Sequence, residues 1–239
     1  MFGFGTIINV AGILLGGLGG LLFGKKIKER FQTTLMMANA VSVLFLGIGG
    51  AMAGMLQVID GGLTTKGTMM IISSMALGAI LGELINMEAG MERFGKWLKV
   101  KTKSEGDAGF VDAFLTASLT VCIGAMAIVG AIQDGLLGDI SILAAKAVLD
   151  AIIILIMTAT KGKGCIFSAI PVAIFQGSIT LLARFIEPVM TEEALANLSL
   201  IGSILIFCVG LNLLWGKKMR VANLLPSLIF AVIWAFLPL

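Results

Sequence analysis

The fold of this chain is decided by a long apolar run in its middle, residues 139–160, which reads DISILAAKAVLDAIIILIMTAT. A helix rises about 1.5 Å per residue, so about 20 such residues cross the roughly 30 Å of hydrocarbon in a bilayer. After Asp139 the only charged side chains in the run are Lys146 and Asp150, which are four residues apart and therefore share one helical face. We expect a membrane-spanning helix with an ion pair buried inside the protein.

The whole chain shares the composition of this run. Of its 239 residues, 58% are hydrophobic and only 13% are charged, whereas soluble domains are about 25% charged. Histidine is absent from the sequence, which removes the commonest general base and zinc ligand. Cys122, Cys165 and Cys208 stand singly in apolar sequence, which favours free thiols. The composition indicates an integral membrane protein that is not an enzyme, with no cofactor, metal site or nucleic-acid partner.

Continuous apolar runs without alternation predict helices, since only helices and closed barrels satisfy the backbone inside a bilayer. We expect an all-α bundle of about eight spans that forms a single membrane domain, residues 1–239. The expected spans are residues 4–23, 34–58, 68–87, 110–132, 139–160, 165–186, 195–215 and 222–238. The stretch 88–109 is expected to be a charged cytoplasmic linker with a short amphipathic helix, which carries Met91, Phe94, Trp97 and Leu98 on one side.

Positive charges divide regularly between the predicted loops. Fourteen of the 17 Lys and Arg residues fall in the loops after spans 1, 3, 5 and 7, and cytoplasmic loops of membrane proteins are enriched in these residues. We therefore expect both termini outside the cell and the four basic loops in the cytoplasm, facing anionic lipid. The opposite loops carry acidic residues, which either are simply solvated or attract cationic solutes. They are Asp60, Asp134, Asp139, Glu187, Glu192 and Glu193.

An internal repeat relates spans 2–3 to spans 4–5 at an offset of 74 residues. Both hairpins would begin and end inside, which makes the predicted repeat parallel, and transporter sites often lie near a repeat interface. Only the second hairpin carries buried charge, because Lys146 and Asp150 align with Ile72 and Ala76. The matching residues are Gly50-Ala51-Met52-Ala53 with Gly124-Ala125-Met126-Ala127, Asp60-Gly61 with Asp134-Gly135, and Leu63 with Leu137.

Glycines four residues apart mark one face of the first span, at Gly12, Gly16, Gly20 and Gly24. In lipid, helices associate through close backbone approach and dispersion, because a hydrophobic drive between helices is missing there. This glycine zipper predicts either tight packing within one chain or a homodimer seam through Gly12, Gly16 and Gly20.

Ionisable side chains inside a span cost at least about 2.5 kcal/mol on insertion scales, so they mark candidate functional sites. Lys146 and Asp150 are either a neutralised pair that fixes packing or a site for a solute or coupling ion. Amides beside glycines, at 133–135 and 176–177, are places where a helix can open towards a ligand, and Pro171 is expected to kink its helix. The candidate binding residues are Lys146, Asp150, Gln133, Asp134, Gln176 and Asn9.

Four segments carry a resemblance to a known family. They are residues 122–136 (CIGAMAIVGAIQDGL), 146–150 (KAVLD), 176–180 (QGSIT) and 5–9 (GTIIN). Over essentially its whole length the chain is similar to the YqgA/YdfK-like bacterial multi-pass membrane proteins, a family of unassigned function often guessed to be transporters. The resemblance implies a bacterial cytoplasmic (inner) membrane location and no catalytic role. It also implies that Gln133, Asp134, Lys146, Asp150 and Gln176 belong to the family's pattern.

Two kinds of function fit these features. The buried pair, the repeat and the missing ATP-binding loop indicate a secondary transporter of a small solute, coupled to protons or ions, or a channel. Without histidine, proton coupling would fall on a carboxylate, and Asp150 is the best placed. The alternative is a structural or signalling scaffold that oligomerises through its glycine faces. The partners expected from sequence are the lipid bilayer and a small solute or ion whose identity the sequence does not determine.

Overall fold

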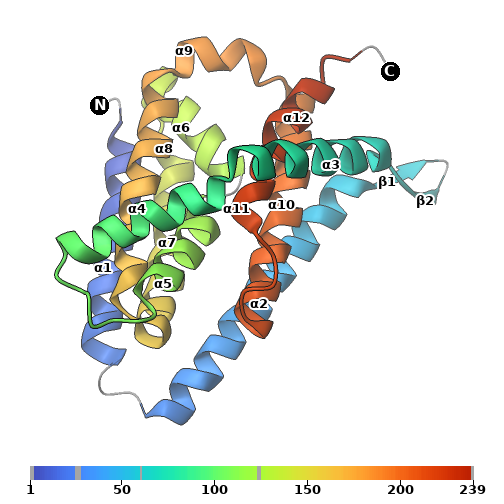
Figure 1. The fold of residues 1–239 in the computed structure, drawn as a ribbon. Coiled ribbons are helices and arrows are strands. Elements are labelled where there is room, and N and C mark those ends of the chain that lie inside the picture. Colours follow the sequence, from blue (N-terminus) through green and yellow to red (C-terminus); the bar gives the residue numbers. More distant parts are fainter. Residues whose placement is uncertain (1–2, 25–27, 60, 123–124, 238–239) are drawn as a thin grey trace.

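The structure, a computed structural model, describes residues 3–24, 28–59, 61–122 and 125–237 (Figure 1). This part of the chain is helical apart from one two-stranded hairpin, which confirms the expected all-helical class. The elements are α1 (Phe4–Gly24), α2 (Glu29–Met55), β1 (Leu56–Ile59), β2 (Gly62–Thr65), α3 (Thr68–Ile85), α4 (Met87–Lys101), α5 (Phe110–Cys122), α6 (Ala125–Leu137), α7 (Ser141–Lys161), η1 (Lys163–Ser168), α8 (Ala169–Leu181), α9 (Ala183–Ile186), η2 (Glu187–Val189), α10 (Glu192–Trp215), α11 (Val221–Leu224) and α12 (Ser227–Trp234).

Six spans are long and apolar enough to cross a membrane, namely α1, α2, α3, α7, η1 with α8, and α10. A seventh forms if α5 and α6, which are bent by 62° relative to each other, cross together. The expected eighth span, residues 222–238, is instead divided at Pro226 into α11 and the eight-residue α12. Proline lacks the N–H that would continue α11, and eight residues of helix reach only about 12 Å. The described residues therefore hold six or seven candidate spans.

A β-hairpin follows α2 where the sequence predicted a helix as far as residue 58. Strands β1 and β2 pair antiparallel, with Leu56 opposite Thr65 and Ile59 opposite Gly62. Asp60-Gly61 favours a two-residue turn, and Gly61 has a φ of +76°, which suits glycine. The predicted span was too long because an apolar run of β-branched residues fits a strand as well as a helix.

The two segments that align at an offset of 74 residues adopt different local structures. Gly61 lies in the hairpin turn, whereas its counterpart Gly135 lies inside α6. Gly50 lies within the uninterrupted α2, whereas its counterpart Gly124 is outside the described residues, as is Asp60. The proposed duplication of spans 2–3 and 4–5 stays a prediction.

The glycine face of α1 packs against α7 of the same chain. A Cβ atom added to Gly12 would lie 2.8 Å from the carbonyl oxygen of Ala147. At Gly16 and Gly20, an added Cβ would meet the α7 backbone at Ala151 and Leu155. The stripe therefore brings two backbones together within one molecule; a pairing of two chains through these glycines stays a prediction.

Two further helices of the N-terminal half pack on helices of the C-terminal half. Helix α2 lies along α10, with Gly50 facing Ser203, and α3 lies on α11 and α12, with Gly82 facing the backbone of Asn223. Figure 1 shows α3 and α4 running across the bundle rather than along it. These pairings join the two halves of the chain, and each has a glycine in the contact.

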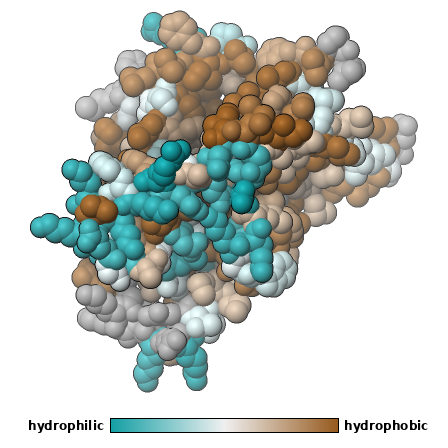
Figure 2. All heavy atoms as spheres, in the orientation of Figure 1, coloured by the Kyte–Doolittle hydropathy of each residue, from teal (hydrophilic) through white to brown (hydrophobic). Residues whose placement is uncertain are grey.

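The charged linker forms the predicted amphipathic helix, α4. Leu98 is buried with Phe114 of α5, and the Phe94 and Phe114 rings lie 5.8 Å apart. The ring of Trp97 is exposed and stacks on Phe94 at 5.7 Å. Figure 2 shows hydrophilic side chains gathered over α4, below a hydrophobic surface over α3. Such a helix, apolar on one side and charged on the other, suits a membrane–water interface.

The start of α1 and the end of α12 are at one end of the bundle in Figure 1, away from the loop between α4 and α5. Several basic residues pair with acids of α3, α4 and α5. The pairs are Asp112 with Lys161 at 2.9 Å, Glu88 with Lys217 at 2.7 Å, Glu92 with Lys217 at 2.7 Å and Glu83 with Arg220 at 3.1 Å. Lys25 and Lys26 of the first basic loop lie outside the described residues. The sidedness of the bundle stays a prediction.

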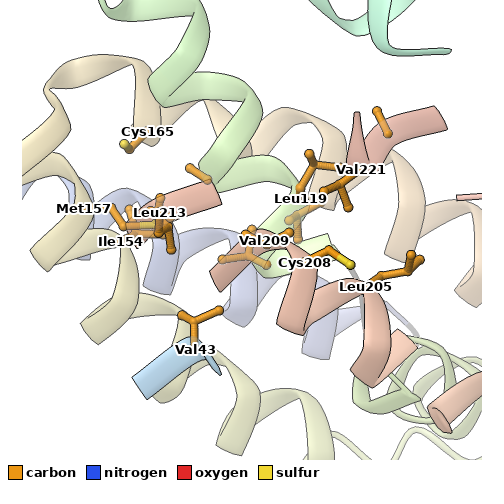
Figure 3. Packing of buried hydrophobic residues seen from close by; sticks show 14 of the residues in the cluster. Val43, Leu119, Ile154, Met157, Cys165, Leu205, Cys208, Val209, Leu213 and Val221 are labelled. Carbon is orange, nitrogen blue, oxygen red and sulfur yellow. The ribbon is translucent and has the colours of Figure 1, made fainter. Parts of the chain in front are cut away.

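The hydrophobic core lies where helices from both halves of the chain meet (Figure 3). It includes Val43, Leu119, Ile154, Met157, Cys165, Leu205, Cys208, Val209, Leu213 and Val221. The three cysteines are free thiols, as predicted. Eight of the 13 residues of α5 are buried, so the end of α5 lies in the interior of the bundle.

Candidate functional site

Lys146 and Asp150 form an ion pair on one face of α7. Their Nζ and Oδ2 atoms are 2.5 Å apart, and the two residues are only 6% and 4% exposed. The sequence spacing of four residues correctly predicted this contact. Each charge is stabilised by the other, because an unpaired charge at this depth would be costly.

The ammonium of Lys146 has a second partner on another helix. It donates a hydrogen bond of 2.8 Å to the carbonyl oxygen of Val121, in the last turn of α5. Carbonyls in the last turn of a helix lack intrahelical partners and carry the negative end of the helix dipole. Because α5 ends at Cys122, Lys146 ties α7 to the end of a divided span.

Two buried amides lie beside the pair. The side chain of Asn9 on α1 donates to Oε1 of Gln176 on α8 at 3.2 Å, and it also interacts with the carboxylate of Asp150. These amides are 0% and 1% exposed. The Oδ1 atom of Asn9 and the Nε2 atom of Gln176 have no partner among the described residues. One acceptor and one donor next to the ion pair are therefore available to a polar ligand or a water.

The line of polar contacts continues along α1 to its beginning. The hydroxyl oxygens of Thr6 and Thr180 are 3.4 Å apart. The fully buried carboxylate of Asp134 accepts the backbone N–H of Gly3 at 3.1 Å and that of Gly5 at 3.0 Å. A carboxylate at the first turn of a helix satisfies N–H groups that have no intrahelical partner. Asp134 therefore caps α1 from α6 and is buried in a helix, not placed in a solvated outer loop as predicted.

We use the name polar row for the buried residues that connect α1, α6, α7 and α8. They are Asp134, Thr6, Thr180, Asn9, Gln176, Asp150 and Lys146. Five of the six predicted binding residues belong to it. The sixth, Gln133, is half-buried on α6, and its side chain makes no hydrogen bond to another described residue.

Three members of this arrangement were missed by sequence reasoning. Thr6 lies three residues before Asn9, and Thr180 lies four after Gln176, so helical spacing could have found both. The Val121 carbonyl could not have been found, because only the end of α5 makes a backbone oxygen available there.

The helix opening is at a different place from those predicted. The sequence favoured breaks at 133–135 and 176–177, but α6 and α8 run through these positions without interruption. The division falls between α5 and α6 instead. Gly135 allows Ala183 and the Thr180 carbonyl to approach α6. Pro171 occupies the first turn of α8, and the change from the 3-10 helix η1 to the α-helix α8 falls just before it. The expected kink in this span stays a prediction.

Two cavities lie next to this region. A charged cavity of about 60 Å³ is lined by Glu88, Asp112, Lys161 and Lys217 among others, and an apolar cavity of about 610 Å³ reaches Cys122 and Pro171. Neither is lined by Lys146 or Asp150, which are both buried. Burial would lower the pKa of Lys217, but its hydrogen bonds with Glu88 and Glu92 raise it above the ordinary value, and the bond to Lys217 lowers the pKa of Glu92.

A helical bundle with six or seven apolar spans and a buried ion pair defines a multi-pass membrane protein. Residues 4–236 match the model of a protein family of unknown function, DUF554, and the chain belongs to this family. It is 33% identical to the uncharacterized membrane protein YdfK of Bacillus subtilis, over 98% of this chain and 96% of that one. It is 28% identical to the uncharacterized protein YqgA of Escherichia coli, over 95% of this chain and 94% of that one. No solved structure matches the chain.

Proposed function

We propose that this chain is a secondary transporter for a small polar solute, in which the Lys146–Asp150 pair couples solute or ion binding to movement of the divided span. The observation that carries the proposal is the bond from Lys146 to the Val121 carbonyl at the end of α5. Divided helices with charged or polar groups at their ends are a recurring feature of transporter binding sites. Ionisable residues inside spans mark ion and solute pathways.

The coupling step follows from the charges. Protonation of Asp150 would remove the partner that holds Lys146, and the freed ammonium would then take an anionic group of the solute. The bond between Lys146 and Val121 would weaken at the same time, and this would release α5 from α7. Because the sequence lacks histidine, Asp150 is the best-placed group to carry the proton. The solute class that fits is a zwitterion or a small anion.

The proposal also covers the orientation of the chain in the membrane and the residues that contact the solute. We place both termini outside the cytoplasmic membrane of a bacterium and the basic loops inside, following the distribution of Lys and Arg. This orientation requires α5 with α6, and α11 with α12, each to cross the membrane in addition to the six long apolar spans. The unpartnered atoms of Asn9 and Gln176 would contact the polar part of the solute. A scaffold function is less well supported, because α7 and α10 cover the glycine faces of α1 and α2 within the chain.

Uptake into proteoliposomes tests the proposal. Labelled zwitterionic amino acids and small organic anions would be offered with an imposed pH gradient, and luminal pH would be followed with a fluorescent dye. We expect flux of at least one solute class, a loss of its pH dependence in Asp150→Asn, and unchanged flux in Glu105→Gln, an exposed loop carboxylate. A lack of flux for every solute in the panel, together with full function of the Lys146→Leu/Asp150→Leu double variant in cells, would overturn the proposal.

A further inference from the structure

The apolar cavity of about 610 Å³ lies between two interrupted helices. Its walls include Cys122 and Ile128, on either side of the division between α5 and α6, and Leu225 and Pro226, between α11 and α12. Phe175 of α8 also lines it. A volume of several hundred Å³ is typical of sites for small organic ligands. The cavity is therefore large enough for a flexible hydrocarbon chain.

The rim of this cavity faces the apolar outer surface of the bundle. Val189, Ile229 and Ile233 line it and are also exposed. In a membrane protein, exposed apolar side chains on a helix such as α12 contact lipid rather than water. Apolar cavities hold apolar ligands better than water. A molecule dissolved in the bilayer can therefore reach this cavity sideways.

One polar atom in the wall points to a ligand that is not pure hydrocarbon. Ser118 is one of the lining residues, and its Oγ atom is fully buried and has no hydrogen-bond partner among the described residues. Buried hydroxyl groups are nearly always paired. An ester carbonyl or a glycerol hydroxyl at this depth would supply the missing partner.

The charged cavity lies next to the apolar one. Leu119 lines both, whereas Thr116 and Asp112, about one and two turns further towards the start of α5, line the charged cavity only. Helix α4 shows the same change, since Met87 and Met91 face the apolar cavity while Glu88 faces the charged one. Going along α5 from Asp112 to Cys122, a distance of about 15 Å, the lining changes from charged to apolar.

The charges at this end are balanced. Two carboxylates, Glu88 and Asp112, and two ammonium groups, Lys161 and Lys217, line the charged cavity and form two ion pairs. A cavity of about 60 Å³ admits a small terminal group rather than a whole lipid headgroup. A terminal ammonium fits in this cavity against the carboxylates.

We propose that the two cavities form one binding site for a zwitterionic amphiphile, a phospholipid with a terminal amine. Its ammonium lies between Glu88 and Asp112, its ester group lies at Ser118, and one acyl chain fills the apolar cavity. The site is separate from the polar row and does not depend on the proposed transport.

Native mass spectrometry of the purified chain tests this site, with lysophosphatidylethanolamine as the probe. We expect one bound molecule per chain, and binding about tenfold weaker for Ile229→Trp, whose bulkier side chain obstructs the rim. Ile174→Trp is the matched control, because Ile174 is 64% exposed on α8 outside the cavity while Ile229 is 60% exposed. Equal binding by wild type and Ile229→Trp would overturn the site.

Two further comparisons test the assigned groups. Lysophosphatidylglycerol has the same chain and phosphate but no amine, and we expect it to bind several-fold more weakly; equal binding would overturn the assignment of the headgroup. Ser118→Ala should weaken lipid binding while raising the unfolding temperature of the lipid-free protein, because it removes an unpaired buried hydroxyl. A loss of binding caused by misfolding would instead lower that temperature. Transport plays no part in these measurements, so their failure leaves the transport proposal standing.

Discussion

Helices α2 and α5–α6 begin from similar sequences and differ in structure. The motif Gly50-Ala51-Met52-Ala53 lies inside an unbroken 27-residue helix, whereas the matching motif at 124–127 falls where α5 has ended and α6 begins. The difference lies in their neighbours. Gly50 is packed against Ser203 of α10, while the end of α5 accepts a hydrogen bond from Lys146. A divided helix in a membrane persists only where another group satisfies its free carbonyls.

The ion pair is the strongest test of this comparison. In Lys146→Leu the carboxylate of Asp150 is left buried without its ammonium partner, and we expect unfolding in detergent to become easier by about 3–5 kcal/mol. The Lys146→Leu/Asp150→Leu double variant leaves no buried charge, so we expect it to lose less than the single variant. Thermal unfolding followed by circular dichroism measures both. If the double variant lost as much stability as Lys146→Leu and Asp150→Leu together, this would contradict the pairing.

The glycine contacts are the next largest effect. In Gly16→Ala the added methyl group meets the backbone of Ala151 on α7, and overpacking of this kind costs about 1–3 kcal/mol. Gly49→Ala on α2 is the control, because no atom lies within 4 Å of its added Cβ and alanine favours a helix by about 1 kcal/mol over glycine. Opposite signs in the two unfolding temperatures are expected; a tolerated Gly16→Ala would contradict the α1–α7 packing.

The cap of α1 is expected to contribute less. Asp134→Asn keeps the shape of the side chain but removes its charge and replaces one of the two oxygens that accept the N–H groups of Gly3 and Gly5 with an NH2 donor. Loss of the charge next to the helix start should cost about 0.5–2 kcal/mol. Hydrogen exchange of the first turn of α1 measures the loss locally. Unchanged protection there would show that the carboxylate is not held at this helix end.

The ion pairs of Lys217 give the smallest effect, and it depends on pH. The pKa of Glu92 is lowered from 4.5 by its bond to Lys217. The ionised carboxylate therefore stabilises the folded protein above pH 4.5, and this stabilisation is lost as the pH falls through the folded pKa. The pKa of Lys217 is raised from 10.5. The charged ammonium therefore stabilises the folded protein below pH 10.5, and this stabilisation is lost as the pH rises through the folded pKa.

The stabilisation by the ion pairs of Lys217 should therefore not change between about pH 5 and 10. Both groups are partly exposed, which limits the change at either end to less than about 1 kcal/mol. Unfolding temperatures of wild type and Glu92→Gln, measured across this range, should converge at low pH. A constant difference down to pH 3 would contradict the role of the Glu92 charge.

The sequence by itself determined the helical membrane class, the amphipathic helix α4, and the position of Lys146 and Asp150 on one face. These features depend on local hydropathy and on the 3.6-residue period of a helix, both of which are written in neighbouring residues. It also marked Asn9 and Gln176 as candidate binding residues. It did not place them in contact, because they lie 167 positions apart in the chain.

Only the tertiary structure decided where the spans stop. Strand β1 after α2, the short α12 and the division between α5 and α6 all lie in segments that the sequence predicted as continuous helix. In lipid, the surroundings are as apolar as the side chains, so hydropathy does not distinguish one helix partner from another. Close glycine contacts and a few buried polar bonds make that choice. The bond from Lys146 to Val121 joins two spans that the sequence predicted as a hairpin, but its acceptor is a backbone carbonyl, which no side chain marks.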